Sequence, residues 1–162
     1  MDAVVKHANN GGFVMGICNG FQILCESGLL PGALLRNENQ LFVCENVYLK
    51  CNNSETAISH LLNEDQAYKI PIAHAEGRYY ASDETLAQLQ ANNQIVFSYC
   101  NAAGEVTPES NPNGSKLNIA GIANEGFNVY GMMPHPERAA SADLFNKDGL
   151  AFFEALLTEV SA

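Results

Sequence analysis

The sequence has 162 residues, enough for one domain with a substantial core and too few for two ordinary domains. Hydrophobic residues make up 47% and no apolar run reaches the length of a membrane span, which indicates a soluble globular protein. The formal net charge of -10 disfavours binding to nucleic acid or to anionic membranes. The five cysteines form no CxxC pair and the N-terminus has no signal-peptide pattern, so we expect reduced thiols, no metal site and a cytoplasmic location.

The first predicted elements surround a glycine-rich turn. Residues 2–8 are typical of the last turns of a helix, which residues 9–12, Asn-Asn-Gly-Gly, would end. A short strand is predicted at 13–17 and a helix from about 19 to 27, with Gly28 as its stop. The chain is therefore expected to run strand, tight turn, helix.

The middle of the chain predicts further strands and one helix. Residues 41–51 indicate one bent strand or two short ones, because Phe, Val, Tyr and Leu are frequent there. A strand at 68–73 contains Pro71, which restricts it to the edge of a sheet or to a strand end. A helix at 83–92 has Ser82 as its expected N-cap.

The second half predicts antiparallel pairs. A strand at 94–100 alternates in polarity, and the long loop at 101–116 separates it from strands at 118–123 and 129–133, which a glycine-containing turn joins as a hairpin. A last helix is expected at 148–159. Its inward face is predicted to comprise Leu150, Phe153, Leu156 and Leu157. These elements together predict the α/β class.

The glycine-rich turn carries the first candidate catalytic residue. The sequence Gly16-Ile17-Cys18-Asn19-Gly20 has the spacing of a nucleophile elbow, in which glycines flank a turn too sharp for side chains. At a helix N-terminus the pKa of the Cys18 thiol is expected to fall, and the backbone amide of Asn19 is expected to face a developing oxyanion. The competing interpretation is a buried structural cysteine, since free cysteine is often buried.

A second candidate pair follows the strand at 129–133. In extended chain, residues two apart project to the same side, so His135 and Glu137 are expected to face together. A cysteine nucleophile needs a base, and the base needs a group that orients it. We therefore predict that Cys18, His135 and Glu137 form a catalytic triad, although a histidine after a strand is more often incidental.

With these motifs the sequence resembles the class I glutamine amidotransferases, and most specifically the glutaminase subunits of phosphoribosylformylglycinamidine synthases. The similarity covers essentially the whole chain. The elbow alone marks the superfamily, whereas its Asn-Gly-Phe-Gln continuation together with the Asn-Pro-Asn-Gly loop marks the subunit. The matching segments, in order, are residues 16–24, 28–34, 70–77, 111–115 and 132–138.

The resemblance implies one glutamine amidotransferase domain over residues 1–162, with a flavodoxin-like mixed sheet flanked by helices. It implies hydrolysis of glutamine through a thioester on Cys18 and delivery of ammonia to a synthetase subunit, with or without a small third subunit. ATP and Mg²⁺ would belong to the synthetase, so no cofactor and no metal are expected in this chain. It also implies that Gln22, His74 and Glu76 contact glutamine, with Arg78 bordering the same pocket or the partner.

The sequence departs from the family in one respect. Members normally begin with several strand and helix units, including a Gly-Gly-Phe-Ser-Tyr-Gly-Asp type loop that supplies a second oxyanion amide, and this sequence does not contain them. We therefore expect a partial domain and a poor glutaminase. Two alternatives stay open: a non-catalytic remnant that binds the synthetase, and a thiol hydrolase on a related fold.

Overall fold

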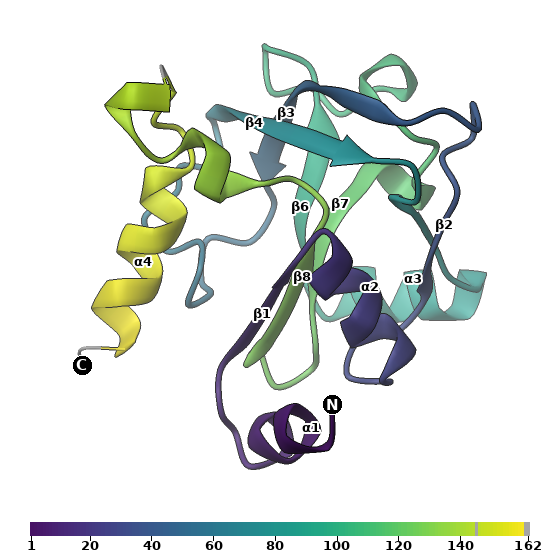
Figure 1. Cartoon of the computed structure of the whole chain (residues 1–162), viewed down its shortest axis with the longest axis vertical. Coiled ribbons are helices and arrows are strands. Elements are labelled where there is room, and N and C mark those ends of the chain that lie inside the picture. The colour runs from purple at the N-terminus through teal and green to yellow at the C-terminus, as the bar shows by residue number, and fades with distance from the viewer. Residues whose placement is uncertain (145, 161–162) are drawn as a thin grey trace.

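A computed structural model describes residues 1–144 and 146–160, and its centre is a six-stranded mixed sheet (Figure 1). The strands of this sheet are β1 (Val14–Ile17), β3 (Val43–Cys51), β4 (Ala67–His74), β6 (Ile95–Cys100), β7 (Ile119–Ala123) and β8 (Val129–Met132). Their spatial order is β1-β8-β7-β6-β3-β4. A separate small sheet pairs β2 (Ala33–Leu35) with β5 (Arg78–Tyr80).

One parallel pair in this sheet determines where the functional groups meet. β1 pairs with β8 in parallel, with Ile17 opposite Met132, and every other neighbouring pair described in the sheet is antiparallel. Parallel neighbours end at the same edge of a sheet. The residues that follow β1 and β8 therefore leave the sheet side by side.

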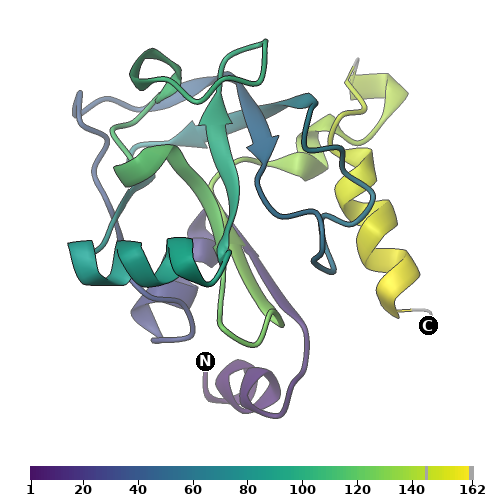
Figure 2. The same cartoon turned by 180° about the vertical axis from the view of Figure 1, so that it is seen from behind.

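Helices cover both faces of the sheet. The helices are α1 (Asp2–Asn9), α2 (Asn19–Glu26), α3 (Asp83–Ala91) and α4 (Leu150–Val160). α2 and α3 share one apolar cluster, to which they contribute Phe21, Leu24, Leu86 and Leu89. α4 contributes Phe152 to a second cluster, which also contains Ile58 and Leu62 from the segment between β3 and β4. Figure 2, which views the molecule from behind, shows α3 in the foreground and α4 at the right edge. Among the described residues, no helix is long and apolar enough to cross a membrane.

Most predicted elements are confirmed. Residues 43–51 form one strand, the hairpin of β7 and β8 is present, and Pro71 lies in the edge strand β4. The Oγ of Ser82 accepts a hydrogen bond of 3.2 Å from the backbone N–H of Thr85, which is the expected cap of α3.

Two predictions about buried faces are wrong. β6 does not alternate, because Val96 and Ser98 are buried as well as Phe97, and this central strand has an apolar cluster on each face. In α4, Leu150 and Leu157 are 36% and 65% exposed. The helix instead turns Phe152 inward, where the ring packs edge-to-face on Tyr68 and tilts against Phe97.

Candidate active site

The turn between β1 and α2 is a nucleophile elbow. Cys18 has φ 52° and ψ −107°, a backbone conformation that is unfavourable for a side-chain-bearing residue and that is typical of functional turns. A Cβ atom on Gly16 would lie 2.6 Å from the backbone carbon of Gly20, so the first glycine of the motif is required by close approach. A hydrogen bond from the Cys18 N–H to the Met132 carbonyl, 2.8 Å, fixes the turn to β8. The elbow prediction is thereby confirmed in its backbone geometry.

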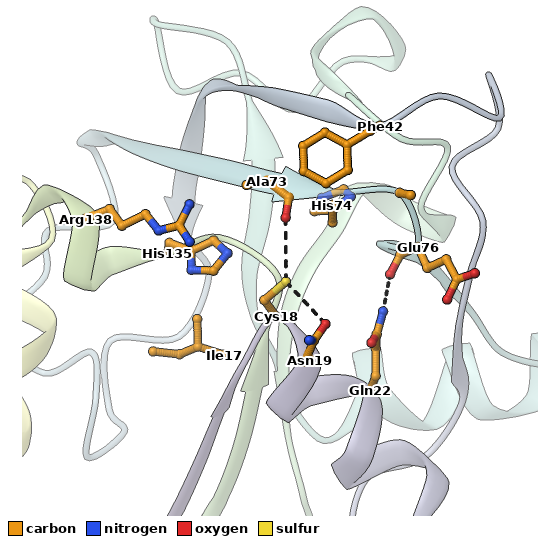
Figure 3. Close-up of a pocket in the computed structure, with 11 residues that line it drawn as sticks. Ile17, Cys18, Asn19, Gln22, Phe42, Ala73, His74, Glu76, His135 and Arg138 are labelled. Atoms are coloured by element: carbon orange, nitrogen blue, oxygen red, sulfur yellow. Dashed lines mark hydrogen bonds between the residues drawn. The ribbon is translucent and has the colours of Figure 1, made fainter.

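The thiol of Cys18 opens onto a cavity of about 500 Å³ at the edge of the sheet (Figure 3). The predicted residues Cys18, Asn19, Gln22, His74, Glu76 and His135 line this cavity, together with Ile17, Phe42, Ala73, Ala75 and Arg138. They come from the β1–α2 elbow and α2, from the residue before β3, from the end of β4 and the turn after it, and from the segment after β8. Residues that are far apart in the sequence therefore share one site because β1 and β8 run in parallel.

His135 and Glu137 form a close pair, but not by the predicted route. The Nδ1 of His135 lies 2.6 Å from the Oε1 of Glu137. The chain is not extended here, because Pro136–Ala139 form a 3-10 helix directly after His135. This tight turn, rather than strand alternation, brings the carboxylate under the imidazole. A hydrogen bond of 2.8 Å from the His135 backbone N–H to the Pro71 carbonyl anchors the pair on β4.

The thiol and the imidazole line the same cavity without a direct hydrogen bond. Within residues 1–144 and 146–160, the Cys18 thiol contacts two oxygen atoms, the Ala73 carbonyl and the Asn19 Oδ1, both at 3.9 Å. The Nε2 of His135 is buried and has no hydrogen-bond partner in that part of the chain. Figure 3 shows the His135 ring and the thiol bordering the same space. Catalytic hydrogen bonds are often long without substrate, so the missing bond does not contradict the triad, which stays a prediction.

The charge state of Cys18 differs from the prediction. Burial raises the pKa of its thiol, and this effect exceeds the lowering by a hydrogen bond from the Asn19 backbone and by the Arg138 guanidinium, whereas Glu137 raises the pKa further. The expected thiolate at the helix N-terminus is therefore wrong for the resting state. A protonated thiol needs a base, and the Nε2 of His135 is the predicted one: it has no hydrogen-bond partner among the described residues, and the Glu137 carboxylate on Nδ1 would stabilise the imidazolium.

The other predicted substrate residues occupy the turn after β4. The Gln22 amide donates a hydrogen bond of 2.6 Å to the Glu76 carbonyl, which joins α2 to this turn. The Glu76 carboxylate lies 3.7 Å from Arg36, and both side chains are more than half exposed, so the ion pair contributes little. Arg78 begins β5 and does not line the cavity. Contact of Gln22, His74 and Glu76 with a substrate stays a prediction.

His74 is the most deeply buried of these residues. Only 4% of its surface is exposed, and burial followed by the nearby His135 lowers its pKa to about 4. Its Nδ1 lies 3.1 Å from the Oδ1 of Asn37, and its Nε2 has no hydrogen-bond partner among the described residues. His74 is therefore neutral at physiological pH.

Sequence reasoning did not find several residues of the site. Phe42, Ala73 and Arg138 line the cavity, and Asn37 lies directly behind it. Arg138 stands within the matched motif of residues 132–138, which was a usable signal. Asn37 gave no signal, because its partners His74 and Gly77 lie 37 and 40 positions later in the chain.

The donor groups of the cavity are suited to acyl transfer. In the part of the chain that the structure describes, no cluster of three histidine, cysteine, aspartate or glutamate residues is placed to hold a metal ion. The cavity residues instead supply a nucleophile, a base and the backbone N–H of Asn19 beside the sulfur, and Glu137, which does not line the cavity, orients the base. Such a set can cleave an amide or an ester.

A comparison with protein families defines the class. The model of the CobB/CobQ-like glutamine amidotransferase domain matches residues 1–148, which is most of the chain and includes every residue of the cavity. A solved structure from Thermoplasma acidophilum, described as part of a putative GMP synthase, has a TM-score of 0.57 at 13% identity over 99% of this chain and 65% of its own, and supports the fold. The chain therefore belongs to the glutamine amidotransferase domain family, and its fold is that of such a domain.

Relatives with higher identity narrow the class. Phosphoribosylformylglycinamidine synthase subunit PurQ of Salinibacter ruber is 52% identical over 99% of this chain and 68% of its own length. PurQ of Moorella thermoacetica is 57% identical over 92% of this chain and 63% of its own length. The structure of PurLQS from Thermotoga maritima has a TM-score of 0.82 at 38% identity, over 97% of this chain and 66% of that one. The chain belongs to the PurQ family and spans about two thirds of the length of these relatives.

Proposed function

We propose that the chain hydrolyses glutamine to glutamate and ammonia at Cys18, as part of phosphoribosylformylglycinamidine synthesis in purine biosynthesis. The observation that carries the proposal is that an elbow cysteine and His135 line one cavity, while the Glu137 carboxylate lies against the Nδ1 of His135. Membership of the PurQ family supports the choice of glutamine as the amide.

The steps of the reaction follow from the positions of these groups. The Nε2 of His135 takes the thiol proton, and the sulfur of Cys18 attacks the carboxamide carbon of glutamine. The resulting oxyanion faces the backbone N–H of Asn19, and Glu137 stabilises the imidazolium of His135. His135 then gives its proton to the leaving nitrogen, so ammonia departs and a thioester remains on Cys18. Water, deprotonated by His135, hydrolyses the thioester to glutamate and regenerates the thiol.

The ammonia is proposed to pass to a synthetase subunit, which would hold ATP and Mg²⁺, with a small third subunit in the same complex. The solved neighbour is named PurLQS, which supports an assembly of this kind. The cytoplasm is the proposed location.

One observation favours the rival function, a non-catalytic module that binds the synthetase. The Cys18 thiol contacts the Ala73 carbonyl rather than His135, and burial raises its pKa. Both features are also expected of a glutaminase in its resting state. The glutaminase and the non-catalytic module therefore differ in whether the Cys18 thiol can be activated.

Covalent labelling with a glutamine-like diazo-ketone separates these functions. We expect rapid, stoichiometric labelling at Cys18, measured by mass spectrometry with and without the synthetase, and glutamine should protect. A His135→Ala variant should react about 100-fold more slowly or worse, because the base is absent. His7→Ala is the matched control, since His7 is exposed and lies outside the cavity. Equal rates in the wild type and His135→Ala would reject the glutaminase. Rapid ester cleavage without glutamine protection would indicate a thiol hydrolase.

A further inference from the structure

Asn37 is a buried amide whose hydrogen-bonding groups are all used. It is 0% exposed. Its side-chain NH₂ group donates to the carbonyls of Leu41, at 2.8 Å, and His74, at 2.9 Å. Its Oδ1 accepts from the backbone N–H of Gly77, at 3.2 Å, and faces the Nδ1 of His74, at 3.1 Å.

These partners fix the orientation of the amide. The carbonyls of Leu41 and His74 can only accept and the N–H of Gly77 can only donate, so exchanging the nitrogen and oxygen of Asn37 would break three hydrogen bonds. The atom that faces His74 is therefore an oxygen, which cannot donate. The Nδ1 of His74 must carry the proton.

The tautomer of His74 follows directly. A neutral imidazole has one N–H, so the Nε2 of His74 carries a lone pair and acts as an acceptor. Burial and the neighbouring His135 keep the pKa of His74 at about 4, which ensures the neutral form at physiological pH. The ring lies close against Gly77, because a Cβ on this residue would lie 2.3 Å from the Cε1 of His74.

This acceptor has no partner among the residues that the structure describes. The Nε2 of His74 is buried without a hydrogen bond in the described ranges 1–144 and 146–160, although His74 lines the cavity. Buried polar atoms are nearly always paired, so an unpaired acceptor on a residue of the cavity that Cys18 also lines indicates a place for a ligand. Phe42 lines the same cavity and is 64% exposed, so its ring can move as a ligand enters.

We infer that Asn37 is a positioning residue, which holds His74 as the Nδ1–H tautomer so that Nε2 accepts a hydrogen bond from the α-ammonium group of the amino-acid substrate. The inference deepens the proposed function and depends on glutamine as substrate. Glutamine has two donor groups, and its carboxamide nitrogen must face His135 to leave as ammonia. The ammonium group is the donor that remains, whereas the α-carboxylate, an acceptor, would be repelled by the lone pair of Nε2.

The tautomer can be measured without any activity. The sequence has four histidines, so ¹⁵N-labelled imidazole spectra are sparse and the His74 signals are those lost in a His74→Gln variant. We expect the Nδ1 of His74 to be protonated and the Nε2 unprotonated from pH 8 to pH 5, the reverse of the tautomer that free histidine prefers. In Asn37→Ala, His74 should no longer be held with its proton on Nδ1. Asn39→Ala is the matched control, because its amide oxygen accepts from the Leu41 N–H and contacts no histidine. A protonated Nε2 in the wild type would overturn the inference.

The substrate half of the inference is tested with glutaramate, which is glutamine without its α-amino group. We expect the wild type to prefer glutamine by about tenfold or more in kcat/KM, because one hydrogen bond to a charged group is at stake. His74→Asn keeps a donor toward Asn37 but loses the Nε2 acceptor, so it should raise the KM for glutamine by about tenfold, leave kcat nearly unchanged and lose the preference. His74→Gln places an oxygen near the Nε2 position and should retain part of the preference for glutamine.

The outcomes separate the two proposals. A His74→Asn variant that is folded, as judged by its melting temperature, could still turn over glutamine and keep the full preference for glutamine over glutaramate. That result would overturn the assignment of the α-ammonium group to His74 and leave the proposed function intact. Absence of glutamine turnover in the wild-type complex with the synthetase would reject the proposed function, and the tautomer measurement would still decide the role of Asn37.

Discussion

The two histidines of the cavity are built alike and differ in one partner. His74 and His135 are both buried, and each has an Nδ1 held by another side chain and an Nε2 without a hydrogen-bond partner among the described residues. For His135 that side chain is the carboxylate of Glu137, at 2.6 Å, and for His74 it is the amide oxygen of Asn37, at 3.1 Å. A carboxylate stabilises an imidazolium, whereas a neutral amide fixes a ring without adding charge. One histidine is thereby suited to carry a proton, and the other to stay a neutral acceptor.

The largest effect on turnover is expected when the carboxylate beside His135 is replaced by an amide, which is the kind of group that lies beside His74. Glu137→Gln replaces the carboxylate by an amide of the same shape, so the imidazolium of the transition state loses its counter-charge. We expect kcat for glutamine to fall by about 100- to 1,000-fold with little change in KM. Steady-state kinetics of the complex with the synthetase measures this, and Glu125→Gln in the β7–β8 turn serves as the control. An unchanged kcat would remove the functional difference between the two histidines.

A second effect concerns the free energy of unfolding at acidic pH, and it depends on His74. The pKa of His74 is about 4 in the folded chain against 6.5 ordinarily, so between these values the unfolded chain binds more protons and stability falls as the pH falls. We expect a loss of about 3 kcal/mol from pH 7 to pH 4 that is due to this residue. Urea unfolding at several pH values should show it, and the loss should be absent in His74→Asn. An equal acid dependence in that variant would contradict the burial of a neutral His74.

The reverse exchange makes His74 resemble His135. Asn37→Asp places a carboxylate beside the Nδ1 of His74 and should raise the pKa of His74 from about 4 toward 6.5. The same change removes two hydrogen bonds to the carbonyls of Leu41 and His74, so a lower melting temperature is expected as well. An NMR titration of the His74 imidazole checks the direction. A pKa that stays near 4 would mean that burial alone decides the charge of this histidine.

The smallest effect concerns the thiol between the two histidines. The Arg138 guanidinium lowers the pKa of Cys18, so Arg138→Gln should raise it. The shift should be a small fraction of the effect of burial, because the Arg138 side chain is 54% exposed and water screens its charge. The pH dependence of alkylation by iodoacetamide reports this pKa. Arg36→Gln is the control, and a shift of the same size in that variant would show a general rather than a local effect of charge.

Local chemistry made much of the fold predictable. Glycine spacing marked the elbow, Ser82 marked the start of α3, and Pro71 marked an edge strand, because each acts within a few residues. The faces of β6 and α4 were wrong because burial there depends on elements distant in sequence, such as the ring of Tyr68 against Phe152.

The site was predictable to the same extent. Cys18, His135 and Glu137 stand in short motifs, so their types and spacing indicated their chemistry. The resting contact of the thiol with Ala73 and the protonated state that burial imposes were not predictable, because both depend on packing across the sheet. Asn37 was missed for the same reason: a buried amide in a turn resembles any other asparagine until its distant partners are known.

One strand at the margin of the sheet supports most of these groups. β4 ends in His74, its Ala73 carbonyl touches the thiol, and its Pro71 carbonyl holds the backbone of His135. Within the described chain β4 pairs with one strand, β3, and its other side is held by separate hydrogen bonds to His135, Asn146 and Asp148. A strand held by few backbone hydrogen bonds opens more readily than one at the centre of a sheet. Gentle heating should therefore inactivate the enzyme before the chain melts.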